Sequence, residues 1–113
     1  MSRNRNKLIT LLIGNLTNVV VHQVLENSVK EEILRKYYDK ESLHSLEIAK
    51  RYREQINPIQ RALPGIDVET IKGEILKRAR NELLLRISKG YRGIELEALE
   101  SILERLLEEL KIK

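Results

Sequence analysis

Two histidines are the residues of this chain best suited to bind a metal ion or transfer a proton, and each has a glutamate at helical spacing. His22 lies one helical turn before Glu26, and Asn15 and Asn18 precede it on the same predicted helix face. A lone His–Glu pair fills too few of the positions that a zinc ion requires. We therefore interpret this face as the solvent side of a core helix, or as a polar layer that sets register at a subunit interface.

Glu41 and His44 form the second pair. An E-x-x-H step places a carboxylate and an imidazole on one helix face, and ferritin-like diiron bundles use two such motifs with glutamates from two further helices. This chain has one E-x-x-H, and its first helix offers Asn where that pattern has Glu. We expect a surface histidine here and neither metal nor other cofactor. A ferritin-like metal-binding bundle, with Glu41 and His44 as candidate ligands, is the third functional hypothesis.

Basic residues next to tyrosines are the candidate surface for a nucleic acid. Tyrosine rings stack on bases while basic groups hold phosphates. The net charge of +4 is too small to require such a partner, and no recognisable nucleic-acid-binding module is present. Nucleic-acid binding is therefore the second hypothesis. Its candidate residues are Arg3, Arg5, Lys7, Arg51, Tyr52, Arg53, Tyr91 and Arg92.

Other catalytic chemistry lacks its usual residues. The chain has no cysteine nucleophile, no G-x-S-x-G turn, no phosphate-binding loop and no glycine-rich dinucleotide motif. We predict that it is not an enzyme. The absence of cysteine gives no sign of an oxidising compartment, so we expect a cytoplasmic protein. A high content of Glu, Lys and Arg is also typical of heat-adapted proteins.

The element that must position most of these residues is an uncharged apolar stretch, Leu8 to Leu25. Such a stretch has to be buried in a membrane, in the chain's own core or in a second copy. Asn15, Asn18 and His22 would be costly inside a bilayer, and no signal-peptide cleavage site follows. We expect protein, not lipid, to cover it.

The periodicity of the whole chain is helical. We expect an all-α bundle of four to five helices in one domain, 1–113. The N-terminal helices span about 4–26, 28–38 and 39–57. Ser28 and Glu31 resemble a capping box and Asp39 is a plausible N-cap, although 28–57 can equally form one helix. A linker covers 58–66. Asp67 then caps a helix that ends at Gly90, and a helix over about 94–111 completes a C-terminal antiparallel hairpin.

The distribution of charge along the chain and the width of its apolar helix faces indicate that the protein assembles. The segment 72–92 is mainly basic and 95–109 mainly acidic, which indicates neighbouring helices that screen each other. Arg86 falls inside an apolar arc, so it either extends its guanidinium to the surface or pairs with a glutamate of the last helix or of a partner chain. We favour pairing across an interface. Our leading hypothesis is a non-catalytic interaction or assembly module that forms a homodimer. The expected interface residues are Leu11, Asn15, Asn18, His22, Arg86, Leu99, Leu103 and Leu106.

Overall fold

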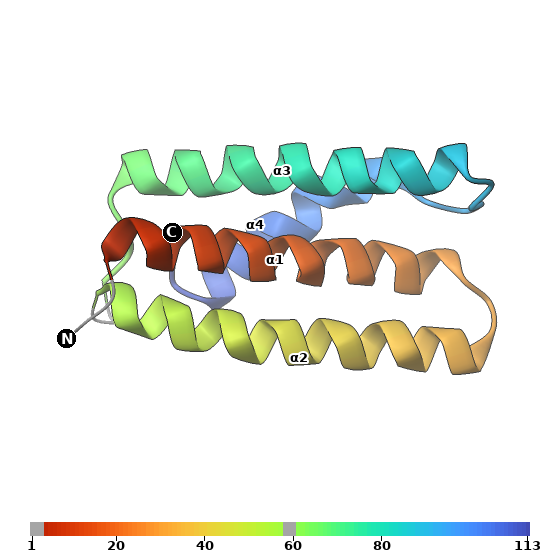
Figure 1. Ribbon diagram of the computed structural model, residues 1–113, viewed down its shortest axis with the longest axis horizontal. Coiled ribbons are helices and arrows are strands. Elements are labelled where there is room, and N and C mark those ends of the chain that lie inside the picture. Colours follow the sequence, from red (N-terminus) through yellow and green to blue (C-terminus); the bar gives the residue numbers. More distant parts are fainter. Residues whose placement is uncertain (1–3, 58–60) are drawn as a thin grey trace.

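The computed structural model describes residues 4–57 and 61–113 (Figure 1). Arg3 and residues 58–60 of the expected linker lie outside this part of the chain. The described residues are all-α, without a strand. Their helices are α1 (Arg5–Ser28), α2 (Glu32–Ile56), α3 (Gly65–Ser88) and α4 (Leu99–Glu109), with the short 3₁₀ helix η1 (Leu96–Ala98) before α4.

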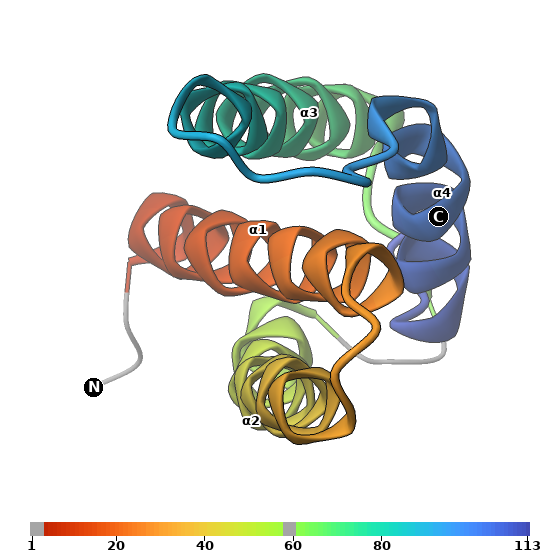
Figure 2. The same ribbon diagram turned by 90° about the vertical axis from the view of Figure 1, so that its right-hand side faces the viewer.

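α1 is the centre of the core and contacts α2, α3 and α4. Figure 2 shows it between α3 and α2, with α4 along one side. Leu12, Leu16 and Val20 are wholly buried, and each such aliphatic side chain stabilises the fold by about 1.5–3 kcal/mol. Length and composition alone would allow α1 to cross a bilayer, but 56% of its most apolar window is buried by the rest of the chain.

α2 is one continuous helix, so the alternative of a single helix over this region is confirmed. The two N-caps expected in this region, Ser28 and Asp39, are wrong. Ser28 ends α1 and its hydroxyl donates to the Leu25 carbonyl at 2.7 Å, while Asp39 lies in mid-helix. The stretch from Glu32 to Ile56 contains neither proline nor glycine that would interrupt the helix.

α3 begins directly after Pro64, and Asp67 lies in its first turn instead of at the N-cap. There the Asp67 carboxylate complements the helix dipole and forms an ion pair with Arg5 of α1. At the other end, Gly90 has the left-handed φ of +100° that we expected from a C-terminal glycine. The Tyr91 amide donates to the Arg86 carbonyl at 3.1 Å, which is the bond of a Schellman motif.

α4 crosses behind α1 instead of running back along α3, so the expected antiparallel hairpin is replaced by an oblique crossing (Figures 1 and 2). After α3, the chain returns toward the middle of that helix before η1 begins. From that position the broad apolar face of α4 packs across the core. Leu103, Leu106 and Leu107 are buried there, as is Ile112 beyond the helix end.

Arg53 ties the ends of α2 and α4 together. Its guanidinium is wholly buried, and each of its three nitrogens donates a hydrogen bond. Nε reaches the Leu110 carbonyl at 3.0 Å, Nη2 the carbonyls of Arg61 and Lys111 at 2.8 and 2.7 Å, and Nη1 the Asn57 side chain at 2.6 Å. Burial lowers the Arg53 pKa. The expectation that Arg53 could contact a phosphate is therefore wrong, because solvent does not reach it.

Candidate binding site on the open face of α1

One face of α1 is left open by the other helices. α2 and α3 each pack on α1 but scarcely on each other, and α4 covers the opposite side (Figure 2). Leu11, Asn15 and His22 are half-buried on the open face, and Asn18 is exposed. We call these four residues the α1 strip.

The polar groups of the α1 strip are held to their own helix. Asn15 Nδ2 donates to the Leu11 carbonyl at 2.9 Å, and His22 Nδ1 lies 2.7 Å from the Asn18 carbonyl. A carbonyl oxygen can only accept, so Nδ1 carries the proton. In the neutral ring, Nε2 of His22 is then left as an acceptor.

Three of the four tyrosines gather at the C-terminal end of the α1 strip. The rings of His22 and Tyr38 have centroids 6.0 Å apart, and Tyr37 meets Tyr38 edge-on at 5.6 Å. The Arg86 guanidinium lies 5.9 Å from the centroid of the Tyr91 ring. We call His22, Tyr37, Tyr38, Arg86 and Tyr91 the Tyr–Arg cluster. It draws on α1, α2, α3 and the turn after α3.

Arg86 is the charged centre of the cluster. Its side chain is 28% exposed, and Nη2 lies 3.8 Å from a carboxylate oxygen of Glu82, one turn earlier on α3. That distance makes an ion pair but is too long for a hydrogen bond. Nε is buried and has no hydrogen-bond partner among the described residues. The expected partner within the chain, a glutamate of the last helix, is therefore not what Arg86 meets.

Tyr38 has a buried ring and a perturbed hydroxyl. Its pKa is raised, first by burial and then by the neighbouring Tyr91 and Tyr37 hydroxyls, while Arg86 acts in the opposite direction. The phenol is protonated at neutral pH with or without this shift.

Large hydrophobic side chains are exposed around the same end of α3. This helix buries a single stripe at four-residue spacing, which ends at Leu83, and its neighbours remain outside. Leu85 is 55% exposed and Tyr91 45%. Leu84 and Ile87 are also exposed. This end of the molecule therefore combines apolar and aromatic surface with a cation.

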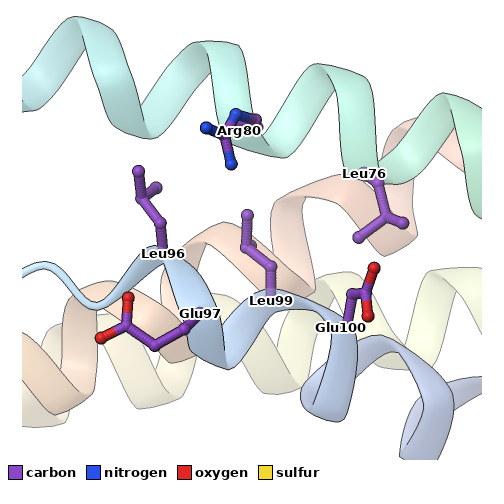
Figure 3. A pocket seen from close by; sticks show the side chains of 6 residues that line it. All are labelled: Leu76, Arg80, Leu96, Glu97, Leu99 and Glu100. Carbon is purple, nitrogen blue, oxygen red and sulfur yellow. The ribbon is translucent and has the colours of Figure 1, made fainter.

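Away from the α1 strip, a groove lies between α3 on one side and η1 with the first turn of α4 on the other (Figure 3). It is a groove of about 660 Å³ lined by Leu76 and Arg80 on one side and by Leu96, Glu97, Leu99 and Glu100 on the other. The basic side of α3 thus faces the acidic start of α4, as the charge pattern predicted. Lys72 Nζ and a Glu104 oxygen complete this contact at 2.7 Å.

The expected interface residues divide into two groups. Leu11, Asn15, Asn18 and His22 form the α1 strip, and Arg86 lies at its end. Leu99, Leu103 and Leu106 are instead buried in the chain's own core. Their assignment to a subunit interface is wrong because α4 crosses onto α1 and covers them within one chain.

The expected nucleic-acid residues are not brought together. Lys7 is exposed in the first turn of α1 and Arg51 near the end of α2, whereas Tyr91 and Arg92 follow the end of α3. The start of α1 and the end of α2 lie at one end of the long axis, and the end of α3 lies at the other (Figure 1). The molecule is 44 Å long, so these groups form no single patch. Arg5 is engaged by Asp67, and Tyr52 packs half-buried against the core.

The two candidate metal ligands, Glu41 and His44, are not joined by a third ligand among the described residues. Glu41 and His44 lie on α2, half-buried and exposed respectively. Among the described residues, no group of three His, Cys, Asp or Glu side chains is arranged to hold a metal ion.

The sequence-based reasoning missed Tyr37 and Tyr38. Their adjacency was visible, but two consecutive helical residues point in different directions, so no sequence period placed them in a site. Their role follows from the position of α2 beside the end of α1.

No known protein family, curated protein or solved structure matches this chain.

Proposed function

We propose that this chain is a non-catalytic helical docking module that forms a homodimer through the α1 strip and the Tyr–Arg cluster. The observation that supports the proposal is their continuity. The open face of the core helix runs directly into a cluster of tyrosines and an arginine, with Leu85 exposed beside it.

The residue types fit docking better than exposure to solvent alone. The cores of protein interfaces are enriched in tyrosine and arginine, and these residues supply many of the energetically dominant contacts. An asparagine in an otherwise apolar helix contact specifies register, since its amide must find a partner. Asn18, exposed at the middle of the strip, is suited to that role.

A second copy is the occupant that the charges favour. Symmetric dimers place the same patch on both sides, so a patch of one sign repels itself. The α1 strip has no formally charged residue, and the nearby side of α3 pairs both signs within itself, as Glu74–Arg78 and Glu82–Arg86. Two copies can therefore meet face to face without unpaired charge.

Light scattering after size exclusion tests the proposal. We expect wild type to have twice the 13.2 kDa chain mass at about 100 μM. Asn18→Arg introduces a charge at the middle of the strip and should shift the dimer to monomer. Ser101→Arg makes the same change at an exposed position of α4, which covers the opposite side of α1, and should not.

A second matched pair tests the apolar margin. Leu85→Glu should weaken dimerisation at least tenfold, about 1.4 kcal/mol. Ile66→Glu, at the other end of the same helix and 79% exposed, should leave it unchanged. A wild-type monomer at 100 μM would overturn the proposal. So would a monomer that binds single- or double-stranded oligonucleotides in a salt-sensitive manner, because that would favour the nucleic-acid function.

A further inference from the structure

We infer that His22 makes dimerisation through the α1 strip sensitive to pH: the two copies associate while the ring is neutral and separate when it takes up a proton. This inference rests on the proposed dimer and adds its regulation. Histidine is the side chain whose charge ordinarily changes between pH 5 and 8. Of the two histidines in the chain, only His22 lies on the α1 strip.

The His22 ring is held in place with one nitrogen unused. Nδ1 donates to the Asn18 carbonyl at 2.7 Å, and the ring centroid lies 6.0 Å from that of Tyr38. Among the described residues, no hydrogen bond reaches Nε2. In the neutral ring Nε2 can only accept, and protonation turns it into a second donor. Each copy therefore brings to the contact an acceptor that acid removes.

Protonation of His22 also adds a charge to a face that has none. The α1 strip contains no formally charged residue, and a two-fold contact brings both copies of that face together. Removing a cation from water without a negative partner is unfavourable. The cost arises in the dimer and not in the monomer, where the half-buried ring still meets solvent.

The carboxylate on the same helix does not balance this charge. Glu26 lies one turn after His22, but no ion pair joins the two side chains in the described part of the chain. Burial and then the neighbouring Asp39 raise the pKa of Glu26, while Arg35 acts in the opposite direction. Glu26 therefore takes up a proton more readily than an ordinary glutamate as the pH falls, which is when His22 would need its charge.

The groups that α2 and α3 bring to the Tyr–Arg cluster are neutral, cationic or already paired. Tyr38 and Tyr37 of α2 carry phenols that stay neutral between pH 5 and 8. Arg86 of α3 is a permanent cation, and the Glu82 carboxylate is paired with it at 3.8 Å. α4 covers the opposite side of α1 (Figure 2). A protonated His22 thus meets a second cation in the cluster and no free carboxylate from these helices.

Sedimentation equilibrium of the full chain at pH 7.5, 6.5 and 5.5, at constant ionic strength, tests this inference. The dissociation constant of the wild-type dimer should rise by about tenfold or more between pH 7.5 and 5.5. His22→Gln stays neutral and can donate to the Asn18 carbonyl, as Gln55 does to the Arg51 carbonyl at 3.2 Å, so its dimer should be equally stable at each pH. His44→Gln removes the exposed histidine of α2 and should leave the pH dependence unchanged.

A permanent charge provides a further variant. His22→Lys should weaken the dimer at all three pH values, because its ammonium group does not lose its charge in this range. Circular dichroism at each pH follows the helical content. Separation of the copies should leave it unchanged, and a loss of helix that accompanies dissociation would overturn the inference.

The outcomes distinguish the pH sensitivity from the dimer itself. A wild-type dissociation constant that is the same at pH 7.5 and 5.5 would refute the role of His22 and leave the dimer standing. So would a pH dependence that survives in His22→Gln or disappears in His44→Gln. A wild-type monomer at pH 7.5 would refute the dimer and this inference together. The wild-type and His44→Gln profiles decide the question even where His22→Gln weakens the dimer at every pH.

Discussion

The buried Arg53 is the feature whose removal should cost this fold most for a single side chain. Arg53→Met keeps the aliphatic stem but removes every guanidinium donor. The carbonyls of Leu110, Arg61 and Lys111 then lose their partners. A buried polar group left unsatisfied costs about 1–3 kcal/mol, and the saving from no longer burying a cation offsets part of the total.

We therefore expect Arg53→Met to lower the free energy of unfolding by about 3–4 kcal/mol, a large share of the roughly 5–15 kcal/mol typical of a domain. Urea unfolding followed by circular dichroism measures it. With a slope of about 1–3 kcal/mol per molar urea, the midpoint should fall by roughly 2 M. Arg53→Lys keeps the charge but not the planar fork, so we expect about 2 kcal/mol.

Two comparisons make this prediction refutable. Arg51→Met removes an exposed arginine from the same helix and should change stability by less than about 0.5 kcal/mol. Asn57→Ala removes an acceptor of Arg53, so its cost in wild type should largely vanish in the Arg53→Met background. A loss of under 1 kcal/mol for Arg53→Met, or full additivity with Asn57→Ala, would show that this hydrogen-bond network does not hold the ends of α2 and α4 together.

Four further predictions concern stability. Lys111 has a φ of +55° at the end of α4, so Lys111→Gly should raise the urea midpoint by relieving left-handed strain of about 0.5–1 kcal/mol. Gly73→Ala should stabilise by a similar amount because it lies inside α3 with no atom within 4 Å of an added Cβ. Gly93→Ala should instead destabilise by about 1–3 kcal/mol, since φ is +79° and the Cβ would lie 2.9 Å from the Ser28 carbonyl oxygen; equal effects of the two alanines would contradict this. The pKa of Glu104 is lowered from 4.5 to about 2 by hydrogen bonds from Lys113 and Lys72. The contribution of the ionised Glu104 to stability should therefore be complete above pH 4.5 and disappear as the pH falls toward 2. A carboxyl NMR titration measures the pKa, and Glu104→Gln should remove this pH dependence.

The elements that repeat a simple pattern were predictable from the sequence. The uncharged stretch from Leu8 to Leu25 lies within the central helix, and Gly90 ends α3 in the left-handed region because glycine adopts it without strain. The caps were not predictable in the same way. Ser28 satisfies an orphan carbonyl at the end of α1 as readily as it would cap the next helix, so its type alone did not decide between them.

The candidate site was predictable only in part. Asn15, Asn18 and His22 share a helix face, and that face is the open one, because polar residues in an apolar helix leave one side with little to bury. The role of Arg53 was hidden, since it depends on carbonyls more than fifty residues away in the chain. The oblique path of α4 was hidden for the same reason, as it follows from tertiary packing and not from the period of its leucines.

The distribution of the tyrosines has a practical consequence for spectroscopy. The chain has no tryptophan, so its intrinsic fluorescence comes from four phenols, three of them at one end of the long axis. Emission will therefore report mainly on that end, whereas far-ultraviolet ellipticity averages over every helix. Denaturation curves from the two signals should coincide if the molecule unfolds as a unit, and a fluorescence transition that comes first would reveal that the tyrosine-bearing end opens while the remaining helices persist.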